Sequence, residues 1–133
     1  MEKIKVEAKV ENLQQVLDFI TSRIEAAGGG MKPQMQVEVA AEELFVNIAS
    51  YAYGDKTGDA EIAIDINDNV ASIDFIDSGV PYDPLAKEDP DVTLSAQERQ
   101  IGGLGIFMVK KTMDDVLYHY VDGKNITTIK KTI

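Results

Sequence analysis

Two side chains in the segment 42–47 have types and a spacing that suit chemistry. Glu43 and Asn47 are four residues apart, so on a helix they share one face, displaced by about a quarter turn or more from the apolar stripe beside them. An Asn oxygen can bind Mg²⁺, which takes water and phosphate oxygens as its other ligands. A Glu beside it can act as a general base. Two solvated helix residues are the alternative, and Glu42 is turned away from Asn47.

A second candidate is Asp77, which ends an alternating apolar run. Counting back by two from Asp77 reaches Phe75 and then Ile73, so the carboxylate is in phase with the buried face of a strand. A buried charge needs a partner. One interpretation is that Asp77 caps the turn at Ser78 and Gly79. The other is that it accepts a hydrogen bond from a ligand amine, such as the amino group of adenine, while Gly79 permits a close backbone approach.

A third candidate is the run Gly102, Gly103, Leu104 and Gly105, which precedes a segment with helical spacing. Glycines expose backbone N–H groups, and a helix N-terminus adds about half a positive charge, so this run suits a phosphate group. Simple flexibility ahead of a helix is the alternative. The sequence has neither a Walker A motif nor a G-x-G-x-x-G, so P-loop and Rossmann nucleotide sites are disfavoured.

Composition excludes several other kinds of function. The chain has 133 residues with no Cys and one His, which excludes disulfide frameworks, thiolate zinc sites and multi-His metal sites. A formal net charge of −10 without a basic cluster argues against nucleic acid as the main partner. The sequence has no secretion signal and no apolar run that could span a membrane. We therefore expect one soluble, cytoplasmic domain over residues 1–133 with no membrane partner.

Alternating and helical segments must position these candidates. Strict alternation over the first ten residues predicts a strand, and helical spacing predicts a helix from Asn12, with Gln15 completing a start that resembles a capping box. The other predicted elements are a helix from Pro33 to about Tyr51, hairpin strands at 61–66 and 70–77, a long loop at 83–101, a helix from about Leu104 to Met113, and strands at about 115–121 and 124–132.

This order of elements predicts an α+β fold. Because the strands alternate instead of being apolar throughout, the sheet should have one face in water and carry all three helices on the other. The prediction is a two-layer α/β sandwich with a mixed, mostly antiparallel sheet.

Read in order, the three candidates resemble a known set of motifs. The pair Glu43 and Asn47, the run beginning at Asp77 and the run beginning at Gly102 are similar to the N, G1 and G2 boxes of the histidine kinase-like (Bergerat) ATP-binding superfamily, which includes gyrase, Hsp90, histidine kinases and MutL. The short length and the sequence after Asp77 look most like the bacterial anti-sigma factor serine kinases. Pro81 stands where the wider superfamily has a glycine, a departure shared with that branch. The resemblance covers nearly the whole chain.

The resemblance implies a role for each matching position. Glu43 would be the catalytic base, Asn47 the Mg²⁺ ligand and Asp77 the adenine anchor. Gly79 would be the close-approach glycine. The residues implied to surround the phosphates are Gly102, Gly103, Leu104 and Gly105. Residues 83–101 would form the lid, in which Arg99 either contacts the terminal phosphate or is solvated. Tyr53, six residues after Asn47, fits an extended N box.

The implied function is that of a protein serine kinase that uses ATP and Mg²⁺. Such a kinase binds a sigma factor and phosphorylates an anti-sigma factor antagonist, a protein with a STAS domain. The resemblance also implies a homodimer. Two alternatives stay open, namely a nucleotide-dependent binding module of the same fold without phosphotransfer and an interaction domain whose pocket has decayed.

Overall fold

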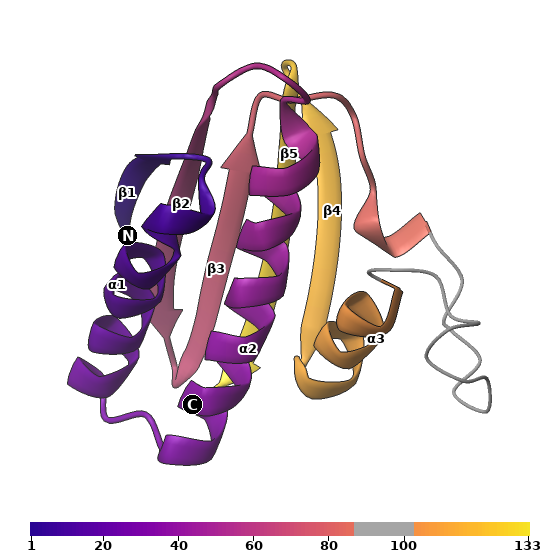
Figure 1. The fold of residues 1–133 in the computed structure, drawn as a ribbon. Helices are drawn as coiled ribbons and strands as arrows, with labels where there is room; N and C mark the ends of the chain where they lie inside the picture. The colour runs from indigo at the N-terminus through magenta and orange to yellow at the C-terminus, as the bar shows by residue number, and fades with distance from the viewer. Residues whose placement is uncertain (87–102) are drawn as a thin grey trace.

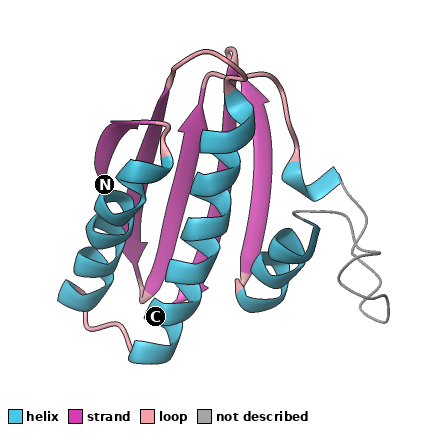
Figure 2. Cartoon of the chain, in the orientation of Figure 1, coloured by secondary structure: helices cyan, strands magenta, loops and turns pink. Residues whose placement is uncertain are grey.

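The structure is a computed structural model that describes residues 1–86 and 103–133. This part of the chain forms two layers, a five-stranded sheet with three α-helices on one face (Figure 1). Figure 2 shows the same separation of helices from strands. The predicted order of elements and the predicted two-layer α+β sandwich are confirmed.

The sheet has the strand order β1-β2-β3-β5-β4. Its strands are β1 (Glu2–Glu7), β2 (Asp59–Asn67), β3 (Val70–Asp77), β4 (Asp115–Val121) and β5 (Lys124–Thr132). Every pair of these neighbouring strands is antiparallel, so the sheet is antiparallel as mostly predicted, and the prediction that it is mixed is wrong. Because β3 is central and pairs with β5, the register sets Asp77 opposite Asn125 at the end of both strands.

The three helices are α1 (Leu13–Ala26), α2 (Met31–Asn47) and α3 (Gly103–Thr112). Figure 1 shows α2 across the middle of the sheet, between α1 and α3. Its buried stripe includes Val37, Ala41 and Leu44, as the spacing predicts. The predicted helix to Tyr51 is divided, since α2 ends at Asn47 and a π-helical turn, η2 (Ile48–Ala52), continues it.

The N-terminal prediction is wrong in two details. The first strand ends at Glu7, and a 3-10 turn, η1 (Val10–Asn12), leaves Val10 55% exposed. The strand stops because its partner β2 begins at Asp59, opposite Glu7. Asn12 does precede α1, but its side chain makes no capping hydrogen bond; its Nδ2 donates to the Glu7 carbonyl at 2.9 Å.

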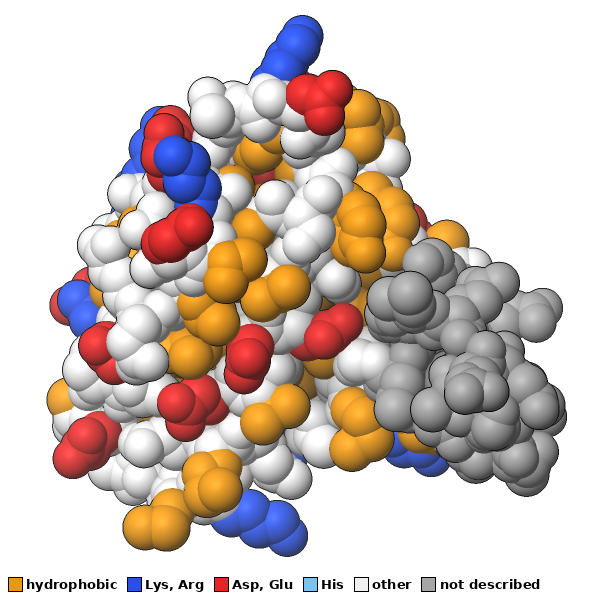
Figure 3. All heavy atoms as spheres, viewed as in Figure 1, with side chains coloured by type: hydrophobic (Ala, Val, Ile, Leu, Met, Phe, Trp, Pro, Cys, Tyr) orange, Lys and Arg blue, Asp and Glu red, His pale blue; other side chains and the backbone are white. Residues whose placement is uncertain are grey.

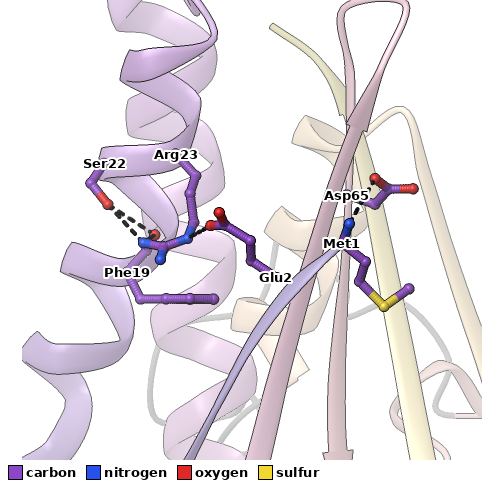
Figure 4. A network of polar contacts seen from close by, with 6 residues as sticks. All are labelled: Met1, Glu2, Phe19, Ser22, Arg23 and Asp65. Carbon is purple, nitrogen blue, oxygen red and sulfur yellow. Dashed lines mark hydrogen bonds and ion pairs between the residues drawn. The ribbon is translucent and has the colours of Figure 1, made fainter.

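Arg23 fastens α1 to the first strand (Figure 4). Its guanidinium donates to the Glu2 carboxylate and to the Phe19 carbonyl, and lies 3.9 Å from the centroid of the Phe19 ring. On β2, Asp65 pairs with the N-terminal ammonium at 3.7 Å. These contacts connect the edge strand β1 to the helix layer and to its neighbour in the sheet.

The predicted loop at 83–101 lies mostly outside the described residues, as do Arg99 and Gly102. Within the described part, Pro84–Ala86 form a 3-10 turn, η3. In the described segments 1–86 and 103–133, no helix combines the length and the apolar character that crossing a membrane requires.

Candidate functional site

A pocket opens between the C-terminal end of α2 and the ends of β3 and β5. It holds about 520 Å³ together with its open mouth. Most of its wall is apolar, as is usual for a small-molecule site. Its lining residues with carboxylate, amide or hydroxyl-bearing aliphatic side chains are Asn47, Asp77, Asn125 and Thr127. The structure therefore brings Asn47 and Asp77, predicted from separate motifs, into one pocket.

Asp77 is buried and is held through one of its two oxygens. It is the last residue of β3 and is 7% exposed. Asp77 Oδ1 accepts hydrogen bonds from the Gly79 amide and from Asn125 Nδ2, each at 2.9 Å. The interpretation that Asp77 caps the turn is thus correct, and the carboxylate is also buried, as its phase along the strand predicts. Within the described segments Oδ2 accepts no hydrogen bond, so this oxygen can receive one from a ligand donor.

Asn125 orients that carboxylate, and the sequence reasoning missed it. The residue is 4% exposed, and its Nδ2 also donates to the Val80 carbonyl at 2.9 Å. Its Oδ1 accepts from the Tyr82 amide at 3.1 Å and from the Tyr118 hydroxyl. The Asn125 side chain, on β5, therefore connects β3 and β4 with the segment that follows β3.

The signal that identifies Asp77 was also present for Asn125. Counting back by two from the buried Ile129 reaches Thr127 and then Asn125, so both polar side chains are in phase with the core. The same count along β5 would have found a second polar group in the pocket.

Gly79 is needed for a close approach, but to the protein's own backbone. A Cβ at this position would lie 2.1 Å from the Ala52 carbonyl oxygen. The same oxygen accepts a hydrogen bond from the Val80 amide at 3.0 Å. The turn after β3 is thus seated against η2, and π-helical turns are frequent at functional sites.

Tyr53 fixes the same turn from the other side. Its hydroxyl donates to the Asp59 carbonyl at 2.5 Å and accepts from the Ser78 amide at 2.9 Å. Burial raises the pKa of Tyr53 above its ordinary value, so the phenol stays protonated and able to donate. Tyr53 is therefore a structural support of the pocket.

Glu43 lines a different hollow. Its half-buried carboxylate packs against Gly105, where a Cβ would lie 2.1 Å from Glu43 Cδ. Burial raises the pKa of Glu43, and the neighbouring charge of Glu42 raises it further. The groove between α2 and α3 that includes Glu43 is lined by Val39, Glu42, Glu43, Val46, Gly105 and Met108. The predicted pair is thus divided, with Asn47 in the pocket and Glu43 in the groove one helical turn away.

The predicted glycine run is described only in part. Gly103 and Leu104 begin α3, and Gly105 supports Glu43. In the described segments, no cluster of three or more His, Asp or Glu side chains is arranged to hold a metal ion. The lone His119 is exposed on β4, opposite Ile126 of β5.

Comparison with known families matches residues 6–131 to the model described as histidine kinase-like ATPase domain. The chain belongs to this family. The serine-protein kinase RsbW of Listeria monocytogenes serovar 1/2a is 27% identical over 119 residues, which cover 86% of this chain and 74% of that protein. The RsbW of Bacillus cereus strain AH820 is 23% identical over 131 residues, or 96% of this chain and 82% of that protein. The family resemblance found in the motifs is confirmed.

The pocket fits the ATP that a histidine kinase-like ATPase domain uses. Its apolar wall suits a purine ring, and Asp77 Oδ2 is an acceptor open to an N–H of a ligand. Such domains generally also need a divalent cation, for which Asn47 offers a neutral oxygen. Mg²⁺ in such sites usually takes its other ligands from phosphate and water.

Proposed function

We propose that this chain is an ATP-dependent protein serine kinase of the anti-sigma factor type, which binds a sigma factor and phosphorylates a small antagonist protein. The observation that carries the proposal is the Asp77 carboxylate, buried at the pocket, fixed through Oδ1 and with Oδ2 open to a donor. A buried carboxylate with one free oxygen selects a ligand that presents an N–H. The similarity to kinases named RsbW supports the serine kinase activity.

Each proposed site residue has one task. Asp77 accepts a hydrogen bond from the adenine amino group, and Asn47 holds Mg²⁺ at the edge of the same pocket. When bound, Mg²⁺ neutralises phosphate charge. The backbone N–H groups of residues 102–105 bind the phosphates. Glu43 accepts the proton that the serine hydroxyl loses as its oxygen bonds to the γ-phosphorus, while the bond from that phosphorus to ADP breaks and ADP leaves. A raised pKa makes the Glu43 carboxylate a better proton acceptor.

The proposal includes the setting in which the kinase works. It acts in the cytoplasm as a homodimer, and its protein substrate is an antagonist with a STAS domain. The acidic net charge of −10 supports protein partners over nucleic acid.

Radiolabelled ATP tests the phosphotransfer directly. The chain is incubated with Mg²⁺, ATP labelled at the γ-phosphate and purified STAS-domain antagonists, and label on serine is measured. We expect one antagonist to be labelled at a rate that depends on Mg²⁺. ATP binding without label on any antagonist would instead identify a nucleotide-dependent binding module.

A further inference from the structure

The outward face of α2 carries an exposed apolar stripe. Met31, Met35 and Val39 follow one another at intervals of four residues and are 79%, 58% and 60% exposed. They lie on the side of the helix away from its buried stripe, where a surface helix normally carries polar residues. Figure 3 shows hydrophobic and acidic side chains interspersed on the face that carries α2. Single exposed apolar residues need no explanation, but an aligned set indicates a contact surface.

This stripe leads into the groove between α2 and α3. Val39 lines the groove together with Val46 and Met108, the last of which is 45% exposed. The groove holds about 710 Å³ together with its opening. Glu43 lies on its wall, so an occupant of the groove reaches the proposed catalytic base.

The charge around the groove is negative. Glu42 is exposed and Glu38 is half-buried on the same helix, and the sequence of α2 contains one basic residue, Lys32. A second copy of this face would bring like charges together, and anionic lipid headgroups would be repelled. The complementary occupant has an apolar side chain next to a basic one.

We infer that the groove binds the polypeptide segment that carries the acceptor serine, with an apolar side chain of that segment between Val39 and Met108 and a basic side chain beside Glu42. The inference rests on the proposed kinase function, because it places the serine hydroxyl at Glu43. Asn47 faces the nucleotide pocket one turn further along the same helix. Helix α2 thus carries one residue for each substrate.

Fluorescent serine peptides test this substrate class. One peptide has Leu and Arg flanking the serine, a second replaces Arg by Glu, and a third replaces Leu by Gln. Anisotropy measures their binding to the full chain in the presence of Mg²⁺ and a non-hydrolysable ATP analogue. We expect the Leu and Arg peptide to bind at least about tenfold tighter than either of the others, the change produced by one lost apolar or charge-assisted contact.

Two matched pairs of variants locate the binding. Val39→Ser should weaken the Leu and Arg peptide about tenfold, whereas Val10→Ser, at a similarly exposed valine outside the groove, should leave it unchanged. Glu42→Lys should reverse the preference between the Arg and Glu peptides, and Glu38→Lys, outside the groove, should not. Val10, Val39 and Glu42 are exposed and Glu38 is half-buried, so thermal melting should show each variant folded.

The outcomes separate this inference from the proposed function. Equal binding of the three peptides, or equal effects of Val39→Ser and Val10→Ser, overturns the groove assignment. ATP binding is measured on the same samples by calorimetry. If the peptide preference is present but ATP does not bind, the kinase proposal fails while the peptide groove stands.

Discussion

The carboxylates of Asp77, at the end of β3, and Glu43, on α2, are held in different ways. Asp77 stands on a central strand, 7% exposed, and hydrogen bonds from the next turn and the next strand fix one of its oxygens. Glu43 stands on a helix, half-buried, and its carboxylate rests against a glycine. Strand pairing therefore builds a rigid acceptor, and helix packing builds a carboxylate whose pKa is raised by burial.

This difference suits two different tasks. Recognition of a ring requires an acceptor with a fixed direction, which Asn125 and the Gly79 amide supply to Asp77. Proton acceptance, the task proposed for Glu43, is favoured by a pKa closer to the working pH, and burial shifts the pKa of Glu43 in that direction. Substitutions can therefore alter the surroundings of one carboxylate while leaving the other intact.

The largest effect is expected on the helix side. Glu43→Gln removes the proposed base but keeps its shape, so phosphotransfer should fall by about 10²- to 10⁴-fold while ATP affinity stays the same. Label transfer and calorimetry measure the two quantities. Glu38→Gln is the matched control, since Glu38 lies on the same helix outside the groove. Wild-type transfer by Glu43→Gln would show that the base is another group.

Asn125→Ala tests how the sheet holds Asp77. It removes one of the two hydrogen-bond donors to Asp77 Oδ1 and the bond from the Tyr82 amide to Asn125 Oδ1, so unfolding should become easier by roughly 1–3 kcal/mol. ATP should also bind about tenfold more weakly, because the carboxylate is less well oriented. Chemical denaturation and calorimetry provide the numbers. Asn67→Ala, which removes an exposed amide from the end of β2, should change neither quantity.

A single added methyl group sharpens the comparison. At Gly79 it meets the Ala52 carbonyl, which belongs to the backbone and cannot move freely, so Gly79→Ala should cost about 1–3 kcal/mol of stability. At Gly105 it meets the end of the Glu43 side chain, which can rotate away. Gly105→Ala should therefore stay folded with less than about 1 kcal/mol lost, and phosphotransfer should fall. A larger stability loss at Gly105 than at Gly79 would contradict the contrast.

The smallest effect is on pH dependence. As an acting base Glu43 must be ionised, so transfer should be lost as pH falls through its pKa, at a pH above the ordinary value of 4.5. A carboxyl whose pKa is raised by folding contributes stability below its unfolded pKa and loses it as pH rises through the folded pKa. Glu43→Gln should therefore gain stability over the wild type near neutral pH, and the gain should vanish in acid. If the stability of Glu43→Gln and of the wild type depends on pH in the same way, the raised pKa of Glu43 is refuted.

Much of the fold could be predicted from local pattern. The turn that joins β4 to β5 contains Asp122 and Gly123, and both take positive φ, which turn residues of these types adopt readily. The strand phase also placed Asp77 on the buried face. The end of the first strand was wrong because alternation continues past Glu7, while the partner strand begins only at Asp59.

The parts of the site that escaped prediction depend on distant contacts. Gly79 is needed because η2 approaches the turn after β3, which no local pattern indicates. The separation of Glu43 from the pocket depends on where α3 packs against α2. Asn125 could have been found, because its phase along β5 is as informative as that of Asp77 along β3.

Calorimetric titration of ATP and GTP into the wild type and Asp77→Asn tests the central claim most directly. In the wild type, Asp77 Oδ2 accepts from the adenine amino group and repels the guanine carbonyl, so ATP should bind at least about tenfold tighter than GTP. In Asp77→Asn, the oxygen that faces Gly79 and Asn125 is kept and an amide N–H faces the pocket, so ATP should weaken and GTP should strengthen. Unchanged ATP and GTP affinities in a folded Asp77→Asn would contradict the account.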